Sequence, residues 1–377
     1  MTRHRYRHRA PRLAFAFVPK LSMAQDTAAT RWLFGHDVVF TPHNAVSDET
    51  ASAWREGGTS LSGVVVLGLA HVTFPFQEVP TRWSQELAER NQPLLDAVLA
   101  SGSIAFAHPL SLDEPPAKRR LLTLACVRRV ATCDSEMQLV AVCCARAVAS
   151  GPNVDKLDVD ELVVADVVTL PDIDVGPPPE STTMGLAIHM VDPRSLATRL
   201  CEQPAVALLV RDPSTLRRRF ESPTELSYWA SEHLPLSLSQ RREILQAGST
   251  STRLRLLLTF AKTMGSMVCS SCGQQWAHAS ELLSLQAHGD GASYVNRHGF
   301  NHSLVCLRST LPSALLLIGR PCPEDCWFKG YAWTIVQCVT CHTHAGWKYT
   351  WAKREGEQGE LAEFWGLRVG SFEQRSE

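Results

Sequence analysis

The sequence predicts an α+β multi-domain protein with a β-rich domain at 61–172, a small helical bundle at 182–264 and an all-β domain at 265–377. Its 377 residues are 45% hydrophobic and 20% charged, which is typical of a globular chain long enough for two or three domains. The hydrophobic period changes from strand-like to helical near residue 180. Two Cys-x-x-Cys pairs, 65 residues apart, then frame most of the last part.

The charge balance excludes some functions. With 37 basic and 38 acidic side chains the chain is nearly neutral, which argues against nucleic acid as the main partner. No run of 18 consecutive apolar residues exists, so we expect no membrane helix. Twelve cysteines spread along a long chain do not resemble the dense disulfide framework of a small secreted domain.

Residues 1–60 are predicted to be a basic, disordered tail. The first 25 residues hold five arginines and no acidic residue. Their apolar patch, Leu13–Val18, is too short for a secretory signal and ends at Pro19. A transit peptide would fit the missing acids, but the segment lacks serine richness.

The β-rich domain is predicted from short apolar runs between turn-forming residues. The expected strands are Gly63–Leu69, Leu121–Val130, Gln138–Val148 and Leu162–Leu170. Leucines at helical spacing predict one helix between Ser84 and Leu99. We therefore expect a mostly antiparallel β domain with one crossing helix.

The proline-rich segment 171–181 is predicted to be a domain boundary. Helices are then expected to begin at Pro193 and Pro213, because each proline follows a capping aspartate. Ser237 with Gln240 has the spacing of a capping box. A further helix is expected from Arg253 to Met264. These helices predict the small bundle.

The strongest chemical motif is the pair of knuckles formed by Cys269 with Cys272 and by Cys338 with Cys341. Four thiolates in two such knuckles complete a tetrahedral site for one structural zinc ion, with no ligand position left open for catalysis. A redox Cys-x-x-Cys is the alternative, but it needs a strand-to-helix context that neither pair shows. We therefore predict that zinc joins two hairpins distant in sequence.

A second motif is a cluster of aromatic residues beside the second knuckle. Trp327, Trp333, Trp347 and Tyr349 lie within 23 residues. Their rings can form an aromatic cage for a cation or a small flat ring. They can equally fill the core of a small domain, and the composition alone does not separate these two interpretations.

Many residues of the last domain closely resemble the thalidomide-binding (CULT) domain of the cereblon family. The matching segments, in order along about 100 residues, are Tyr294-Val-Asn296, Asn301-His302, Ile318-Gly-Arg-Pro321, Trp327-Phe328, Gly330-Tyr-Ala-Trp-Thr334, Gln337-Cys338, Gly346-Trp347-Lys348 and Phe364-Trp-Gly-Leu367. Upstream, Leu234-Pro235, Gln240, Leu245 and Arg253-Leu254 resemble the helical tail of Lon N-terminal-like domains, and Val64–Pro80 resembles their first strands. The cereblon family joins these two modules in this order.

The resemblance implies a Lon N-terminal-like β domain, the helical bundle and a C-terminal zinc-binding CULT domain of the β-tent fold. It also implies a non-enzymatic substrate receptor of a cullin-RING ubiquitin ligase, in the cytoplasm or nucleus, with a damaged-DNA-binding-type adaptor as its partner. Its ligands would be cyclic imides at protein C-termini or small imides. By position, the tryptophans at 327, 333 and 347 are the cage walls, Tyr349 lies beside them, and Asn296 and Asp325 are polar contacts.

Some positions depart from the family pattern. Asp325 stands where the family usually has histidine, and Lys329 where it has proline. Because Glu324 precedes Asp325, the cage could favour a cation instead of an imide. Cys322 and Cys326 also replace other residues and are expected to be free thiols, with a disulfide or a metal site as alternatives. His342 and His344 are expected to lie near the knuckle without binding the metal.

Two alternative functions follow from the residues. One is a ligand-binding module for imides or cations that has no ligase partner. The other is an enzyme similar to zinc-containing sulfoxide reductases, which would need Cys322 or Cys326 as an activated nucleophile. A Lon-type protease is excluded because the chain has no phosphate-binding loop of the GxxxxGK[ST] type.

Overall fold

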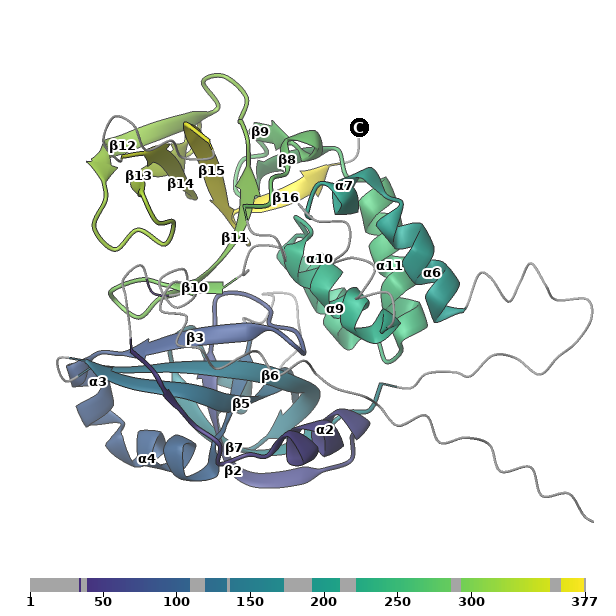
Figure 1. Cartoon of the computed structure of the whole chain (residues 1–377), viewed down its shortest axis with the longest axis vertical. Coiled ribbons are helices and arrows are strands. Elements are labelled where there is room, and N and C mark those ends of the chain that lie inside the picture. Colours follow the sequence, from purple (N-terminus) through teal and green to yellow (C-terminus); the bar gives the residue numbers. More distant parts are fainter. Residues whose placement is uncertain are drawn as a thin grey trace, which may run out of the picture.

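The computed structural model describes residues 34, 39–108, 119–133, 136–172, 192–210, 222–285, 293–352 and 361–375. Over these residues the chain is mixed α+β and rich in strands, and its C-terminal region is all-β, as predicted. Figure 1 shows a lower β unit, an upper β region near the C-terminus, and a group of helices to the right, above the lower unit. None of the helices in these ranges is long and apolar enough to cross a membrane.

The lower β unit is a seven-stranded sheet. Its strands are β1 (Thr41–Pro42), β2 (Ser60–Gly68), β3 (Glu78–Trp83), β4 (Ser103–Ala107), β5 (Arg120–Cys133), β6 (Glu136–Ser150) and β7 (Leu162–Thr169). The order is β1-β5-β4-β2-β7-β6-β3, and a further β5–β6 pairing closes five of the strands into a ring. All pairs are antiparallel except β2 with β4. The helices α2 (Asp48–Glu56), α3 (Gln85–Arg90) and α4 (Gln92–Ser101) pack on this unit, and the 3₁₀ turn η1 (Val154–Lys156) precedes β7.

All four strands expected from the apolar runs are present, as β2, β5, β6 and β7. The prediction of a single helix between Ser84 and Leu99 is wrong in detail. The structure has two helices there, because Ser84 caps α3 and Asn91 ends it just before Pro93 starts the next helix. Strands β3 and β4 were not expected.

The predicted boundary of the disordered tail, at residue 60, lies too far toward the C-terminus. Residues 1–33 and 35–38 lie outside the described part, but β1 and α2 fall inside the predicted range. The N-cap Ser47 accepts a hydrogen bond from the Thr50 N–H, and Ala51 and Trp54 are buried against the β unit. Because Trp54 completes this core, the ordered region begins well before residue 61.

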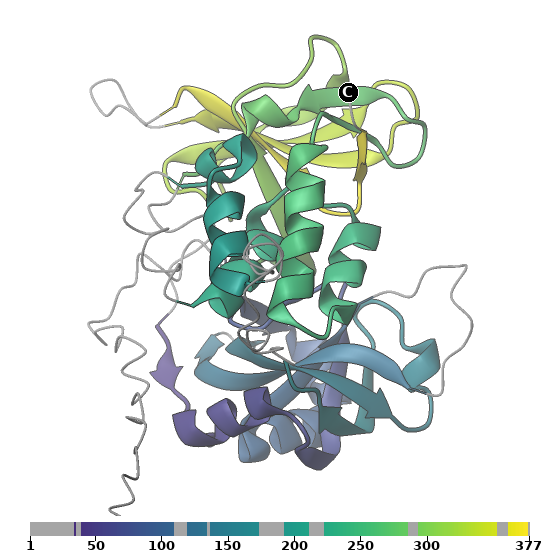
Figure 2. The same ribbon diagram turned by 90° about the vertical axis from the view of Figure 1, so that its right-hand side faces the viewer.

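The helical part comprises α6 (Pro193–Cys201), α7 (Pro204–Ala207), α9 (Pro223–His233), α10 (Leu238–Gln246) and α11 (Thr250–Lys262). The predicted capping box at Ser237 and Gln240 is present, and Asp192 caps the helix that begins at Pro193. The helix expected at Pro213 and most of the boundary segment 171–181 lie outside the described residues. Figure 2 shows these helices between the lower β unit and the upper strands.

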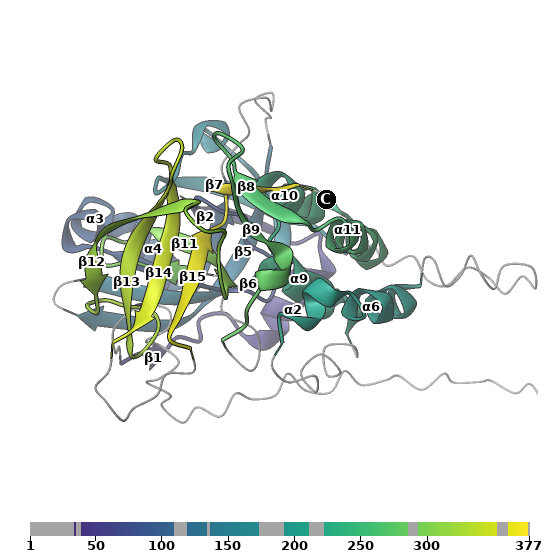
Figure 3. The same cartoon turned by 90° about the horizontal axis from the view of Figure 1, so that it is seen from above.

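The C-terminal region holds two sheets. A six-stranded sheet has the order β10-β11-β15-β14-β13-β12, with β10 (Ser293–Val295), β11 (Asn301–Leu307), β12 (Leu315–Cys322), β13 (Tyr331–Cys338), β14 (His344–Trp351) and β15 (Glu363–Arg368). A three-stranded sheet has the order β16-β8-β9, with β8 (Ser266–Cys269), β9 (Gln275–His278) and β16 (Phe372–Arg375), and the 3₁₀ turn η2 (Ala279–Glu281) follows β9. Figure 3 shows β12, β13, β14 and β15 side by side.

The six-stranded sheet separates two cores, because alternate residues of a strand point to opposite faces. Val336, Ala345 and Leu367 lie on the face that packs with the helices. Tyr349 and Phe364 belong to a separate aromatic cluster. The residues proposed as a ligand cage therefore lie on the face of the sheet that does not pack on the helices.

Candidate metal centre and aromatic site

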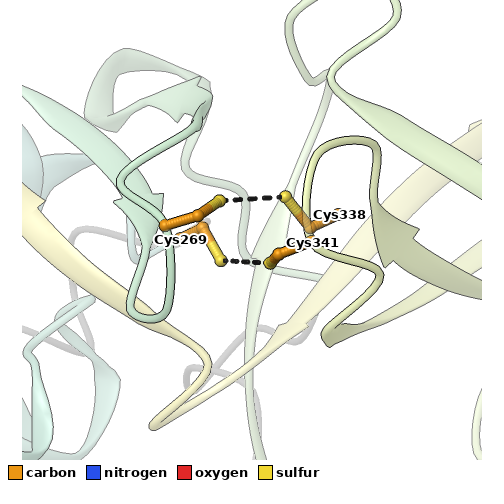
Figure 4. Close-up of side chains that lie close together, drawn as sticks. Cys269, Cys338 and Cys341 are labelled. Atoms are coloured by element: carbon orange, nitrogen blue, oxygen red, sulfur yellow. Dashed lines mark hydrogen bonds between the residues drawn. The ribbon is translucent and has the colours of Figure 1, made fainter.

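Each cysteine pair lies in a tight turn after a strand. Cys269 ends β8 and Cys338 ends β13, and the two turns have the same backbone form. The Gly273 N–H donates to the Cys269 carbonyl at 2.9 Å, and the His342 N–H donates to the Cys338 carbonyl at 3.0 Å. Gly273 and His342 both have positive φ, at 75° and 61°. Because the turn is repeated, both sulfurs of one knuckle face both sulfurs of the other (Figure 4).

The four sulfur atoms lie within 4.8 Å of one another. The Sγ atoms of Cys269 and Cys341 are 3.6 Å apart, as are those of Cys272 and Cys338. This separation is far too long for a disulfide, whose sulfurs lie about 2.05 Å apart. It is close to the edge of about 3.8 Å in a tetrahedron of sulfurs around zinc at about 2.3 Å. The donor set and its geometry therefore fit one tetrahedral zinc ion.

The surroundings of Cys341 favour the thiolate that a metal needs. A hydrogen bond of 3.2 Å joins Cys341 Sγ to Thr343 Oγ1. Together with a hydrogen bond from the Thr343 main chain, it lowers the pKa of the Cys341 thiol to about 6. His342 is exposed and His344 is half-buried, and neither belongs to the group of possible ligands found in the described residues. The prediction that these two histidines do not bind the metal thus agrees with this geometry.

The aromatic site is built on β13 and β14. Trp333 pairs with Tyr349 across the two strands, and Ile335 pairs with Trp347, so these side chains share one face of the sheet. Trp327 comes from the segment between β12 and β13. Its ring lies nearly perpendicular to that of Trp347, at 80° with 5.1 Å between centroids. Two of the three predicted cage walls are therefore in direct contact.

Hydrogen bonds from the indoles fix the position of two walls. Trp327 Nε1 donates to the Val295 carbonyl at 3.0 Å, which ties the segment before β13 to β10. Trp333 Nε1 donates to the Glu324 carbonyl at 2.8 Å. Asp325 follows in a left-handed conformation with φ 52°. Trp327 is buried, whereas Trp333 and Trp347 are half-buried and keep surface for a ligand.

Tyr349 and Asn296 have internal partners in this structure. Tyr349 is only 1% exposed and stacks on Phe364 at 4.8 Å, so it forms the core beneath the site. The Oδ1 atom of Asn296 accepts hydrogen bonds from the N–H groups of His298 and Phe300, which closes the β10–β11 turn. Their assignment as ligand contacts stays a prediction.

His302 is a residue of this site that the sequence analysis did not select. Its ring contacts Trp347 at 5.0 Å and Trp327 at 5.7 Å. Burial, with help from Arg368, lowers the pKa of His302 to about 3, so the imidazole is neutral at pH 7. Its Nδ1 atom is buried without a hydrogen-bond partner. The only sequence signal was its place in the Asn301-His302 motif.

Neither Cys322 nor Cys326 forms a disulfide, as expected. Cys322 Sγ donates to Glu324 Oε2 at 3.0 Å, and this interaction raises the pKa of the thiol. Cys326 is 2% exposed. An activated nucleophile needs a lowered pKa and access to substrate, so neither thiol has the features of a catalytic cysteine.

The fold and this site define a class of protein. It is a strand-rich α+β protein whose C-terminal β region is closed by a four-cysteine clamp and carries an aromatic site on its sheet. No protein-family model matches the chain.

Individual proteins do match it. The chain is 38% identical to protein cereblon of Danio rerio over 147 residues, which is 39% of this chain and 33% of that protein. For cereblon of Xenopus tropicalis the identity is 34% over 155 residues, covering 41% and 34%, and for that of Gallus gallus it is 37% over 147 residues, covering 39% and 32%. The chain thus spans about a third of the length of the curated relatives it matches. The resemblance to the cereblon family is therefore shown over about two-fifths of the chain.

Proposed function

We propose that this protein is the non-catalytic substrate receptor of a cullin-RING ubiquitin ligase. It recognises cyclic imides at protein C-termini, or small imide ligands, and passes the bound protein to ubiquitination and proteasomal degradation. The observation that carries this proposal is the perpendicular contact of Trp327 with Trp347 on the cysteine-clamped sheet, in a chain similar to cereblon.

The chemistry of the site suits an imide. An imide ring is flat and has one N–H and two carbonyl groups, so aromatic walls can cover its faces while polar groups meet its edge. The neutral His302 ring, against both tryptophans, has an unpaired Nδ1. The Asn296 Nδ2 lies 3.4 Å from His302 Nε2, which favours the tautomer with the proton on Nδ1. Because Nδ1 is buried, His302 supports the two tryptophan walls and is not itself a contact of the imide.

One zinc ion, held by Cys269, Cys272, Cys338 and Cys341, is part of the proposal. It supplies no catalytic chemistry, because the four thiolates complete its coordination. Its role is to hold the turn after β8 against the turn after β13, and so to fix β13, which carries Trp333. The Lon N-terminal-like and CULT identities of the two β regions are proposed on the same resemblance.

The first test is a titration of the whole zinc-loaded chain with glutarimide, in which tryptophan fluorescence reports binding. We expect saturable binding that Trp347→Phe weakens at least about tenfold, because the wall against Trp327 is reduced. The matched control is Trp351→Phe, on the same strand β14 but in contact with Tyr331, which should bind normally. Binding of a trimethylammonium compound instead of glutarimide would mean that Glu324 and Asp325 make the site cation-selective.

The ligase role needs its own experiment. Affinity purification of the tagged chain from its host cells should recover a damaged-DNA-binding-type adaptor and a cullin. If the chain binds imides but recovers neither the adaptor nor a cullin, it is a ligand-binding module that lacks a ligase partner. We propose the cytoplasm or nucleus as its location in either case.

A further inference from the structure

An arginine lies on the same face of the six-stranded sheet as the aromatic site. Arg368 ends β15 and pairs with Leu304 of β11, which belongs to the aromatic cluster. Its side chain is half-buried, and burial lowers its pKa. In the described part of the chain no carboxylate forms an ion pair with it. A partly buried cation without a counter-ion costs free energy, so its place beside the site needs an explanation.

The guanidinium of Arg368 is hydrogen-bonded to His344, the first residue of β14. Arg368 Nη1 lies 3.2 Å from His344 Nδ1. Because a guanidinium can only donate, Nδ1 accepts, and the neutral imidazole carries its proton on Nε2. His344 Nε2 then donates that proton to the Gly346 carbonyl at 3.0 Å. Burial, with a smaller effect of Arg368, lowers the pKa of His344, so the ring is neutral at pH 7. Both ring nitrogens are engaged, which fixes the orientation of the ring.

The fixed imidazole lies against a wall of the proposed cage. The rings of His344 and Trp347 are perpendicular, at 89° with 4.9 Å between centroids. On its other contacts Trp347 meets His302 at 5.0 Å and Trp327 at 5.1 Å. Because Trp347 is only half-buried, these neighbouring rings, and not a surrounding core, hold its indole in place. Arg368 is therefore connected to Trp347 through His344.

The charge of Arg368 also affects which ligand the site accepts. Glu324 is exposed and Asp325 is half-buried, and the Glu324 carbonyl accepts from Trp333 Nε1, so both acids stand near the site. Water and salt screen an exposed charge more than a partly buried one. The partly buried guanidinium therefore opposes the attraction that the two carboxylates exert on a cation.

We propose that Arg368 positions Trp347 through His344 and disfavours cationic ligands at the aromatic site. This inference rests on the proposed function, because it concerns the ligand class that the same site selects, a neutral ring in preference to an ammonium. Arg368 is a positioning residue, since it acts on the wall through the imidazole and on the ligand only through its electrostatic field.

The test compares two compounds with a six-membered ring on the whole zinc-loaded chain. Glutarimide is neutral and piperidinium is a cation. We expect the unchanged chain to prefer glutarimide. Arg368→Met removes the charge and the donor, and it should raise the affinity for piperidinium relative to glutarimide about three- to tenfold. Arg368→Lys keeps the charge, so the ratio of the two affinities should stay within about twofold of its original value.

A second measurement needs no ligand. The indole N–H resonance of Trp347, assigned by its loss in Trp347→Phe, should shift in Arg368→Met. It should not shift in Arg308→Met, the matched control, which removes an exposed cation just after β11. If the unchanged chain binds neither compound, the proposed imide site fails, and the resonance alone decides whether Arg368 positions Trp347.

Two results would overturn the inference. One is an equal loss of affinity for both compounds in Arg368→Met, with their ratio unchanged, which is what a purely structural role of this arginine predicts. The other is a Trp347 resonance that stays in place in Arg368→Met or moves as far in Arg308→Met.

Discussion

Arg253 joins two parts of the chain through one side chain. It is fully buried on α11, and its guanidinium donates to both carboxylate oxygens of Asp172, at 2.8 and 3.1 Å. The guanidinium also lies 4.0 Å from the centre of the Tyr228 ring, and the Tyr228 hydroxyl donates to the same carboxylate. Asp172 stands just after β7, so this cluster fastens the helices to the β unit.

We expect Arg253→Met to lower the free energy of unfolding by about 3 kcal/mol. The substitution keeps the length of the side chain but leaves Asp172 with only part of its compensation, from Arg146. Urea denaturation measures the change. The control is Arg255→Met, two residues along the same helix and exposed, for which the change should stay within about 0.5 kcal/mol. Equal losses in both variants would show that the cluster adds no stability of its own.

At the scale of elements, the cysteine clamp joins the three-stranded sheet to the six-stranded sheet. Cys269 and Cys338 are buried at strand ends, and both belong to the core shared with the helices. The residues between the knuckles, 273–337, close a long loop whose ordering costs conformational entropy. A metal bound at its base offsets part of that cost, because binding free energy then counts as folding free energy.

We expect one zinc ion per chain, and none in the double variant Cys269→Ser/Cys341→Ser. Elemental analysis of the purified chain gives the metal content, and near-UV circular dichroism follows the tryptophans. Chelation should erase most of the near-UV signal of the C-terminal region. Cys322→Ser is the control, since this thiol is outside the cluster and should leave one zinc ion bound. A chain that keeps its signal and its stability without metal would contradict a structural role.

The approach of β14 to β15 depends on Gly346. It has φ 148°, and a Cβ atom there would lie 2.0 Å from the Gly366 carbonyl oxygen, which is a backbone atom and cannot turn away. Gly346→Ala must therefore push the two strands apart beside Trp347. We expect a loss of about 2–3 kcal/mol in urea denaturation. Gly248→Ala is the matched control, because nothing lies within 4 Å of its added Cβ. Similar stability of both variants would refute the close-packing argument.

At the scale of the whole molecule, the sequence predicts those features whose geometry is local. Each knuckle is encoded within about five residues, so the four cysteines could be selected from spacing alone. Strand β3 was missed because Pro80 lies within it, and proline is tolerated there only because β3 is an edge strand. That property depends on the order of strands, which no local pattern contains.

The aromatic site shows the same limit. Trp327 and Trp347 could be selected, but which strand pairs with which decides what each ring contacts. The register places Tyr349 in the core against Phe364, and it brings His302 from β11 to the tryptophans. Neither contact follows from residue type or spacing, because both depend on strands far apart in the sequence.

A buried polar contact also joins the two β regions, and it contains a titratable group. His71, between β2 and β3, lies 3.0 Å from the Ser293 hydroxyl of β10, to which Gln77 also donates. Burial, with a smaller effect of Arg241, lowers the pKa of His71 to about 3. Its Nδ1 atom has no hydrogen-bond partner, so a proton added there would be buried beside a cation.

This contact predicts that acid separates the two β regions. In the unfolded chain histidine has a pKa near 6.5, so between about pH 6.5 and 3 the unfolded state binds the extra proton. The free energy of unfolding should therefore decrease as the pH is lowered across this window, by about 1.4 kcal/mol per pH unit for this histidine. His108 and His302, whose pKa values burial also lowers to about 3, contribute in the same sense.

The measurement is urea denaturation from pH 7.5 to 4.5, together with hydrogen exchange at β10. His71→Asn should reduce the slope of the free energy of unfolding against pH by the equivalent of about one proton. Asparagine can still form a hydrogen bond with Ser293 but cannot be charged. His278→Asn, on β9, should keep the full slope. In the unchanged chain, exchange at β10 should rise as the pH falls toward 5, and it should rise less in His71→Asn. An identical slope in both variants would mean that His71 does not control the contact, and that the other buried histidines account for the acid sensitivity.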